Sequence, residues 1–163
     1  DVFVFIFFGL VSTLGVNFLY STQLDFDLFL PAIGIGLLSV AVLNLNNMRD
    51  EASDRKSGKN TIVVQMGGEK AKKYHYFLII TAMVVFVVFA LLNNFNIDQY
   101  LFLVAYYPLV KHLDTVKKNT NPKELDPELK KVALSTFLLS VLFSLCMIYF
   151  FSDVIVNTFM GGR

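Results

Sequence analysis

The stretch that decides the fold is Leu28–Leu45, LFLPAIGIGLLSVAVLNL, followed directly by the polar run Asn46–Thr61, NNMRDEASDRKSGKNT. The first part carries no charged residue. A helix that spans a bilayer needs about 17–25 mostly apolar residues. Residues 28–45 therefore predict a membrane-spanning helix, and the polar run predicts the place where that helix leaves the bilayer.

Four further apolar runs predict additional spans. Ile97–Val110 is the shortest, and Pro108 near its end would kink or terminate a helix, so a re-entrant or half-spanning helix is the alternative there. We expect an all-α fold, a polytopic membrane bundle of about five transmembrane helices in one domain that covers residues 1–163. The other three runs are Val2–Tyr20, Tyr76–Leu92 and Val132–Phe151.

The composition agrees with a membrane protein. Of the 163 residues, 55% are hydrophobic and 17% are charged, and the mean hydropathy is +0.59. Soluble domains are usually about 45–50% apolar and about 25% charged. The net charge of +1 gives no reason to expect a nucleic-acid partner. The single Cys146 lies inside an apolar run, so no disulfide framework is expected.

The positive charges lie in alternate connections between the runs. Seven of the 14 Lys and Arg residues lie in residues 46–75, six lie in residues 111–131, and the last is Arg163. Basic loops near a span stay on the cytoplasmic side. We therefore expect both basic connections and the N-terminus to be cytoplasmic, with the C-terminus outside.

Asn46, Asp50 and Asp54 are spaced four residues apart. On an α-helix each step of four turns by only about 40°, so the three side chains can share one face. Oxygen donors of this kind suit Mg²⁺, which is typically held by one or two carboxylates together with waters and phosphates. The three residues are therefore a predicted metal site.

Basic side chains surround these carboxylates, namely Arg49, Arg55, Lys56 and Lys59. A metal and nearby cations can stabilise the charge that develops on a diphosphate leaving group. The alternative is a solvated cytoplasmic loop with ion pairs between residues four apart, and spacing alone leaves it open.

The pattern Asn46-Asn47-x-Arg49-Asp50-x-x-x-Asp54-x-x-x-Gly58-Lys59-x-Thr61, followed by Gly67, resembles the second aspartate-rich motif of the UbiA superfamily of intramembrane prenyltransferases. The paired asparagines before Arg49-Asp50 are most similar to the branch that prenylates 1,4-dihydroxy-2-naphthoate in menaquinone synthesis. The resemblance extends over nearly the whole chain.

This resemblance implies a nine-helix fold in which two aspartate-rich motifs face each other and hold Mg²⁺ and a polyprenyl diphosphate. It implies that Asp50 and Asp54 are the catalytic, metal-binding carboxylates with Asn46 beside them, and that Arg49, Arg55 and Lys59 are candidate contacts for the diphosphate. It implies transfer of the polyprenyl group to an aromatic acceptor in the bacterial inner membrane. The first motif, Asn-x-x-x-Asp-x-x-x-Asp, is not in this sequence, and the chain begins Asp1-Val2 without Met. We therefore expect the chain to match the C-terminal five helices, to need the missing N-terminal helices of the same protein, and to be inactive alone.

Other functions stay open. The same superfamily contains enzymes with other aromatic acceptors. Phosphatidyl-alcohol transferases also use intramembrane aspartates with Mg²⁺, but their Asp-Gly pair does not occur here. A non-catalytic transporter or scaffold segment is a further alternative, although transporters place ionisable groups near the bilayer midplane. His75 and His112, at the ends of apolar runs, are interpreted as interfacial anchors.

Overall fold

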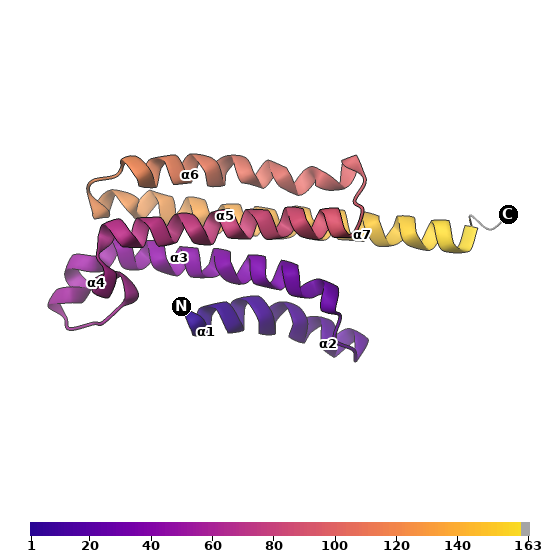
Figure 1. Cartoon of the computed structure of the whole chain (residues 1–163), viewed down its shortest axis with the longest axis horizontal. Helices are drawn as coiled ribbons and strands as arrows, with labels where there is room; N and C mark the ends of the chain where they lie inside the picture. Colours follow the sequence, from indigo (N-terminus) through magenta and orange to yellow (C-terminus); the bar gives the residue numbers. More distant parts are fainter. Residues whose placement is uncertain (161–163) are drawn as a thin grey trace.

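The chain folds as a bundle of helices that run side by side (Figure 1). The computed structural model describes the backbone of residues 1–160 and the side chains of residues 1–148, and this part of the chain contains helices and turns but no strand. The expected all-α membrane bundle is confirmed. In chain order its elements are α1 (Val2–Val4), η1 (Phe5–Gly15), α2 (Val16–Ser21), η2 (Phe26–Leu28), α3 (Phe29–Lys56), α4 (Ile62–Met66), α5 (Gly68–Leu92), η3 (Ile97–Ala105), α6 (Tyr106–Lys118), η4 (Pro122–Leu125) and α7 (Asp126–Met160).

Four helical segments in the described part are long and apolar enough to cross a membrane: Val2–Ser21, Phe26–Lys56, Gly68–Leu92 and Pro122–Ile148. The predicted span at Ile97–Val110 is not among them. It forms the 3₁₀-helix η3 and then enters α6, whose second half is charged.

The η3–α6 segment nevertheless runs alongside α5 and α7 (Figure 1). A 3₁₀-helix rises about 2.0 Å per residue and an α-helix about 1.5 Å, so a 3₁₀-helix needs fewer residues to span the same length along the bundle. Pro108 lies in the first turn of α6, where a missing N–H costs little, and the segment continues through it.

Phenylalanine side chains from three elements fill the core. Phe86 of α5, Phe102 of η3 and Phe143 of α7 are all buried. The Phe86 and Phe143 rings meet edge to face with centroids 4.9 Å apart, and Phe102 and Phe143 do so at 5.5 Å. Edge-to-face pairs of aromatic rings contribute stabilising free energy in addition to that from burying their apolar surface. This contact explains how η3 is held against α7 although it does not qualify as a span.

Both basic connections lie at the same end of the bundle, on the left of Figure 1. Arg49 Nη1 donates to Asp126 Oδ1 at 2.8 Å, and Lys72 Nζ donates to the Asn119 carbonyl at 2.8 Å. The two turns that lack Lys and Arg, between α2 and α3 and between α5 and η3, lie at the opposite end (Figure 1). This arrangement agrees with the alternation of charge along the sequence.

Glycines allow α3 to approach its neighbours closely. A Cβ atom on Gly9 would lie 2.6 Å from the Cα atom of Gly36, and one on Gly34 would lie 2.5 Å from Cε2 of Phe86. Contacts this short require the neighbour to move. A Cβ atom on Gly15 would meet only Val11 Cγ1, at 3.8 Å, which is ordinary contact. Close packing through small residues is the usual way in which helices associate within a membrane.

We expect Gly9→Ala to lower the thermal unfolding midpoint, whereas Gly15→Ala should leave it unchanged or raise it. Both changes improve helix propensity by about 1 kcal/mol. At Gly9 the added methyl also forces η1 and α3 apart, which typically costs about 1–3 kcal/mol. Thermal unfolding of the two variants in the same detergent checks this, and equal midpoints would contradict the close contact between Gly9 and Gly36.

Candidate functional site

The polar motif is a direct extension of α3. The helix continues beyond Leu45 to Lys56, so Asn46, Asp50 and Asp54 all lie on it, as their spacing predicted. The helix then stops at a turn in which the Ser57 N–H donates to the Ser53 carbonyl at 3.0 Å. Gly58 follows with φ of +75°, a left-handed conformation that glycine adopts without strain. The chain therefore reverses just beyond the last aspartate.

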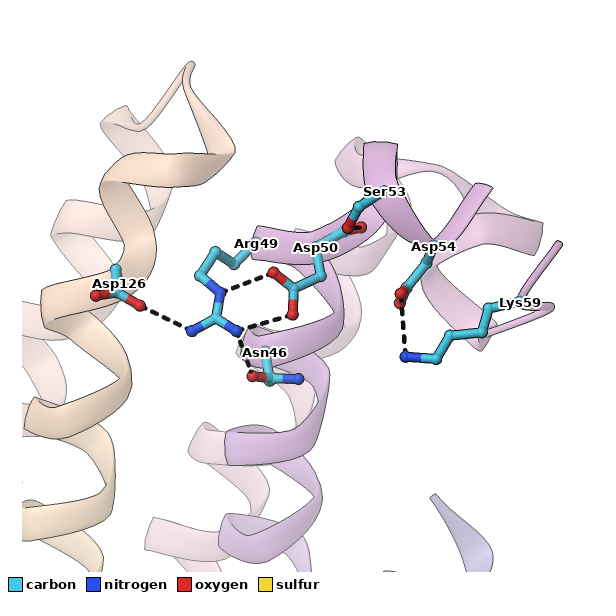
Figure 2. A network of polar contacts seen from close by, with 7 residues as sticks. All are labelled: Asn46, Arg49, Asp50, Ser53, Asp54, Lys59 and Asp126. Atoms are coloured by element: carbon cyan, nitrogen blue, oxygen red, sulfur yellow. Dashed lines mark hydrogen bonds and ion pairs between the residues drawn. The ribbon is translucent and has the colours of Figure 1, made fainter. Parts of the chain in front are cut away.

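Arg49 is the centre of the site (Figure 2). Its Nε and Nη2 atoms donate to the two carboxylate oxygens of Asp50, each at 2.8 Å. Nη2 also donates to Asn46 Oδ1 at 2.9 Å, and Nη1 donates to Asp126 Oδ1 at 2.8 Å. A guanidinium has five donors in a planar fork, which suits a paired contact with a carboxylate. One cation thus gathers oxygen atoms from α3 and from the start of α7.

Asp54 lies one turn further along α3 and has a different partner. Its side chain is buried, and Oδ1 accepts from Lys59 Nζ at 3.2 Å. Figure 2 shows Lys59 folded back toward Asp54 from beyond the turn. The Lys59 N–H also donates to the Asp54 carbonyl at 2.9 Å, which holds this reversal. Asp54 and Lys59 therefore form a second pair next to the Arg49 cluster.

Arg55 lies away from these two pairs. Its Nη2 donates to Glu51 Oε1 at 3.0 Å and to the Val64 carbonyl of α4 at 3.3 Å. Of the predicted residues, the structure thus gathers Asn46, Arg49 and Asp50 in one cluster and places Asp54 with Lys59 beside it. It brings Arg55 to α4 instead.

A polar cleft of about 740 Å³ opens between the end of α3 and the η4–α7 corner. The sequence analysis assigned none of Asp126, Lys123 and Asn121 to the site. The one available signal was that both basic connections should lie at the same end. Among the described residues, the ammonium groups of Lys56 and Lys123 make no hydrogen bond or ion pair. The cleft is lined by Arg49, Asp50, Ala52, Ser53, Lys56, Asn121, Pro122, Lys123 and Asp126.

An apolar pocket of about 480 Å³ lies next to this cleft, between the first helical segment, α3 and α7. Asn46 lines this pocket and also accepts a hydrogen bond from Arg49, which lines the polar cleft. A cavity for apolar groups therefore adjoins a cleft with carboxylates and cations. The pocket is lined by Val4, Phe8, Ser39, Val42, Leu43, Asn46, Leu129, Ala133 and Thr136.

The oxygen donors beside Arg49 bear on whether this site can hold a divalent cation. No group of three His, Cys, Asp or Glu side chains in the described part is arranged to hold a metal ion. Mg²⁺, however, commonly takes one or two carboxylates and completes its shell with waters and phosphate oxygens. Asn46, Asp50 and Asp126 already direct oxygen atoms at one positive group. The chemistry of these donors fits Mg²⁺ bound together with a phosphate ligand.

Comparison with known proteins gives a consistent answer. The model of the UbiA prenyltransferase family matches residues 1–126. The chain is 40% identical over 145 residues to a 1,4-dihydroxy-2-naphthoate octaprenyltransferase of Haemophilus influenzae, and 39% identical over 145 residues to the protein of that name in Escherichia coli. Each match covers 89% of this chain and 47% of the relative. The chain thus spans about half the length of the curated relatives it matches. No solved structure matches it.

We expect Arg49→Gln to destabilise the chain more than Arg55→Gln. The first change leaves Asp50 and Asp126 without their cation, and hydrogen bonds to charged groups typically contribute about 1.5–3 kcal/mol. The second breaks one exposed ion pair, which typically contributes about 0–1 kcal/mol. Thermal unfolding in detergent at low salt measures both. Equal shifts would show that Arg49 does not join α3 to α7.

Proposed function

Because this chain belongs to the UbiA prenyltransferase family, we propose that the protein transfers a polyprenyl group from polyprenyl diphosphate to an aromatic acceptor. The observation that carries the proposal is the junction at Asn46, where an apolar pocket meets a cleft lined by carboxylates and cations. A polyprenyl diphosphate has the same two parts, an apolar chain and an anionic head. Its allylic carbon would lie where the two cavities meet.

We propose 1,4-dihydroxy-2-naphthoate as the acceptor, which makes the reaction a step of menaquinone synthesis. The names of the Haemophilus influenzae and Escherichia coli relatives support this choice over other aromatic acceptors. The family match favours prenyl transfer over a transporter or scaffold role. We further propose that the active unit includes the N-terminal helices that the family resemblance implies, since the relatives are about twice as long as the matched region.

In this proposal Asn46, Asp50 and Asp54 hold Mg²⁺, and Asp126 adds a further oxygen donor at the edge of the cleft. The metal, when bound, supplies a Lewis acid that stabilises the diphosphate leaving group. Arg49 would contact diphosphate oxygens, which its planar fork suits as well as it suits a carboxylate. Lys59 and Arg55 are proposed as further diphosphate contacts. Lys56 and Lys123 face the same cleft and add positive charge to it.

We expect Asp50→Asn and Asp54→Asn to lower prenyl transfer about 100-fold or more, because each removes a charged metal ligand. Glu51→Gln is the matched control, since Glu51 pairs with Arg55 instead of Arg49. The assay measures Mg²⁺-dependent transfer from polyprenyl diphosphate to 1,4-dihydroxy-2-naphthoate in membranes that also contain the N-terminal helices. The chain without them is the negative control. If Asp50→Asn and Glu51→Gln behaved alike, the proposed metal site would be wrong.

We also propose that the basic end of the bundle faces the bacterial cytoplasm. Cysteines introduced at Ser57 and Asn119 should then react with a membrane-impermeant thiol reagent only after the inner membrane is opened. A cysteine at Asn94, at the opposite end, should react from outside in intact spheroplasts. Cys146 is buried, so the unmodified chain supplies the background. Labelling of position 57 from outside would reverse the proposed orientation.

A further inference from the structure

A continuous row of polar side chains crosses the interior of the bundle from α3 to α7. The side chains of His75 on α5 and His112 on α6 are fully buried, as are those of Asn44 on α3 and Glu128 on α7 apart from a few per cent of their surface. The interpretation of His75 and His112 as interfacial anchors is therefore wrong. Lys131, half-exposed, ends the row at the surface.

Polar contacts link the members of this row one after another. His75 Nε2 lies 2.7 Å from His112 Nε2, and His112 Nδ1 lies 2.6 Å from Glu128 Oε2. The other carboxylate oxygen of Glu128 accepts from Lys131 Nζ. At the far end Asn44 Nδ2 lies 3.5 Å from His75 Nδ1 and donates to the Ala71 carbonyl at 3.2 Å. Each imidazole thus has a partner at both ring nitrogens.

Both ends of the row determine where the protons lie. The Ala71 carbonyl requires the NH₂ group of Asn44 on its side, and this group lies 3.4 Å from Met48 Sδ and 3.5 Å from His75 Nδ1, so we assign Nδ1 as an acceptor. A neutral imidazole carries one N–H, so His75 donates from Nε2 to His112 Nε2. His112 then carries its proton on Nδ1 and donates to Glu128, whose negative charge Lys131 balances. All the hydrogen bonds run in one direction, from Asn44 to Glu128.

The row ends beside the candidate site. Glu128 lies two residues after Asp126, which contacts Arg49, and one residue before Leu129, which lines the apolar pocket. Within residues 1–148, side-chain hydrogen bonds join α7 to other helices at two points. One is the pair of Asp126 with Arg49 of α3, and the other is the pair of Glu128 with His112 of α6. The first turn of α7 is therefore held from both sides.

We propose that His112 is a positioning residue that holds the first turn of α7 through Glu128, so that Asp126 and Leu129 face the polyprenyl diphosphate. This inference rests on the proposed function. His112 acts through Glu128 and touches no substrate, so its loss should weaken binding of the prenyl donor more than it slows the chemical step. A merely structural role would lower stability without this selective effect on the donor's KM.

Two substitutions of His112 separate its two contacts. The amide of Asn reaches the position of the imidazole Nδ1, so His112→Asn keeps a donor for Glu128 and loses the contact with His75. The amide of Gln reaches the position of Nε2, so His112→Gln keeps the contact with His75 and loses Glu128. We expect His112→Gln to raise the KM for polyprenyl diphosphate about 10-fold with kcat changed much less. His112→Asn should stay near the wild-type KM.

The control for lost stability is Tyr76→Phe. Tyr76 Oη donates to the Leu113 carbonyl at 2.6 Å, so this change also removes a hydrogen bond between α5 and α6 but leaves α7 untouched. Its thermal unfolding midpoint should fall while the KM for polyprenyl diphosphate stays unchanged. Equal KM values for His112→Gln, His112→Asn and Tyr76→Phe would overturn the positioning role.

Nuclear magnetic resonance of the ¹⁵N-labelled protein in detergent tests the row without any activity. We expect His75 protonated on Nε2 and His112 on Nδ1; the reverse tautomers would overturn the direction of the row.

The guanidinium signals of Arg49 report its contact with Asp126, so they should change in His112→Gln and persist in His112→Asn. Unchanged Arg49 signals in His112→Gln would overturn the positioning role. If the wild-type protein transferred no prenyl group, the proposed function would fail, and the Arg49 signals would still decide the positioning role.

Discussion

The polar end of this bundle depends on the guanidinium of Arg49, which is shared between Asp50 on its own helix and Asp126 on α7. Two carboxylates directed at one point repel each other unless a positive charge lies between them. Arg49 supplies that charge and also binds the amide oxygen of Asn46. The contact joins segments 77 residues apart in the chain. It therefore sets the width of the cleft as well as the charge within it.

The interior of the bundle contains a buried carboxylate, that of Glu128, whose charge must be compensated. A buried carboxylate in an apolar environment is costly unless it is both paired and hydrogen-bonded. Glu128 meets both conditions, because Lys131 balances its charge and His112 donates to its second oxygen. The imidazoles extend this pairing as neutral groups, so the row reaches α3 without a second buried charge. The same first turn of α7 thus carries one carboxylate that faces the cleft and one that faces the core.

Much of the fold follows from local patterns in the sequence. The apolar runs at Leu28–Leu45 and Tyr76–Leu92 became membrane-length helices because length and apolarity are properties of each segment by itself. The four-residue spacing of Asn46, Asp50 and Asp54 placed them correctly on one helix, because α3 continues past the apolar run. The alternation of basic connections correctly placed both of them at one end of the bundle.

The rest depends on contacts between distant segments, which single-sequence patterns do not contain. Asp126 was not assigned to the site because its partner Arg49 lies on another helix, 77 residues away in the chain. His75 and His112 looked like interfacial side chains because each stands at the end of an apolar run, yet each is buried by the other and by the helices around them. The segment at Ile97–Val110 departed from the prediction because η3 is held by aromatic contacts with α5 and α7, which permit a 3₁₀ winding that its own sequence does not indicate.

The pairing of charges also bears on how a diphosphate and a metal would enter the proposed site. Asp50 and Asp126 share the cation Arg49, and Asp54 is paired with Lys59. A divalent cation entering by itself would displace these cations and leave them without partners, and a diphosphate entering by itself would draw them away from the carboxylates. If the two bound together, the carboxylates would hold the metal, and Arg49 and Lys59 would be free to contact phosphate oxygens. Each of these side chains would then still face a group of opposite charge, which would favour joint binding of the metal and the diphosphate in the proposed site.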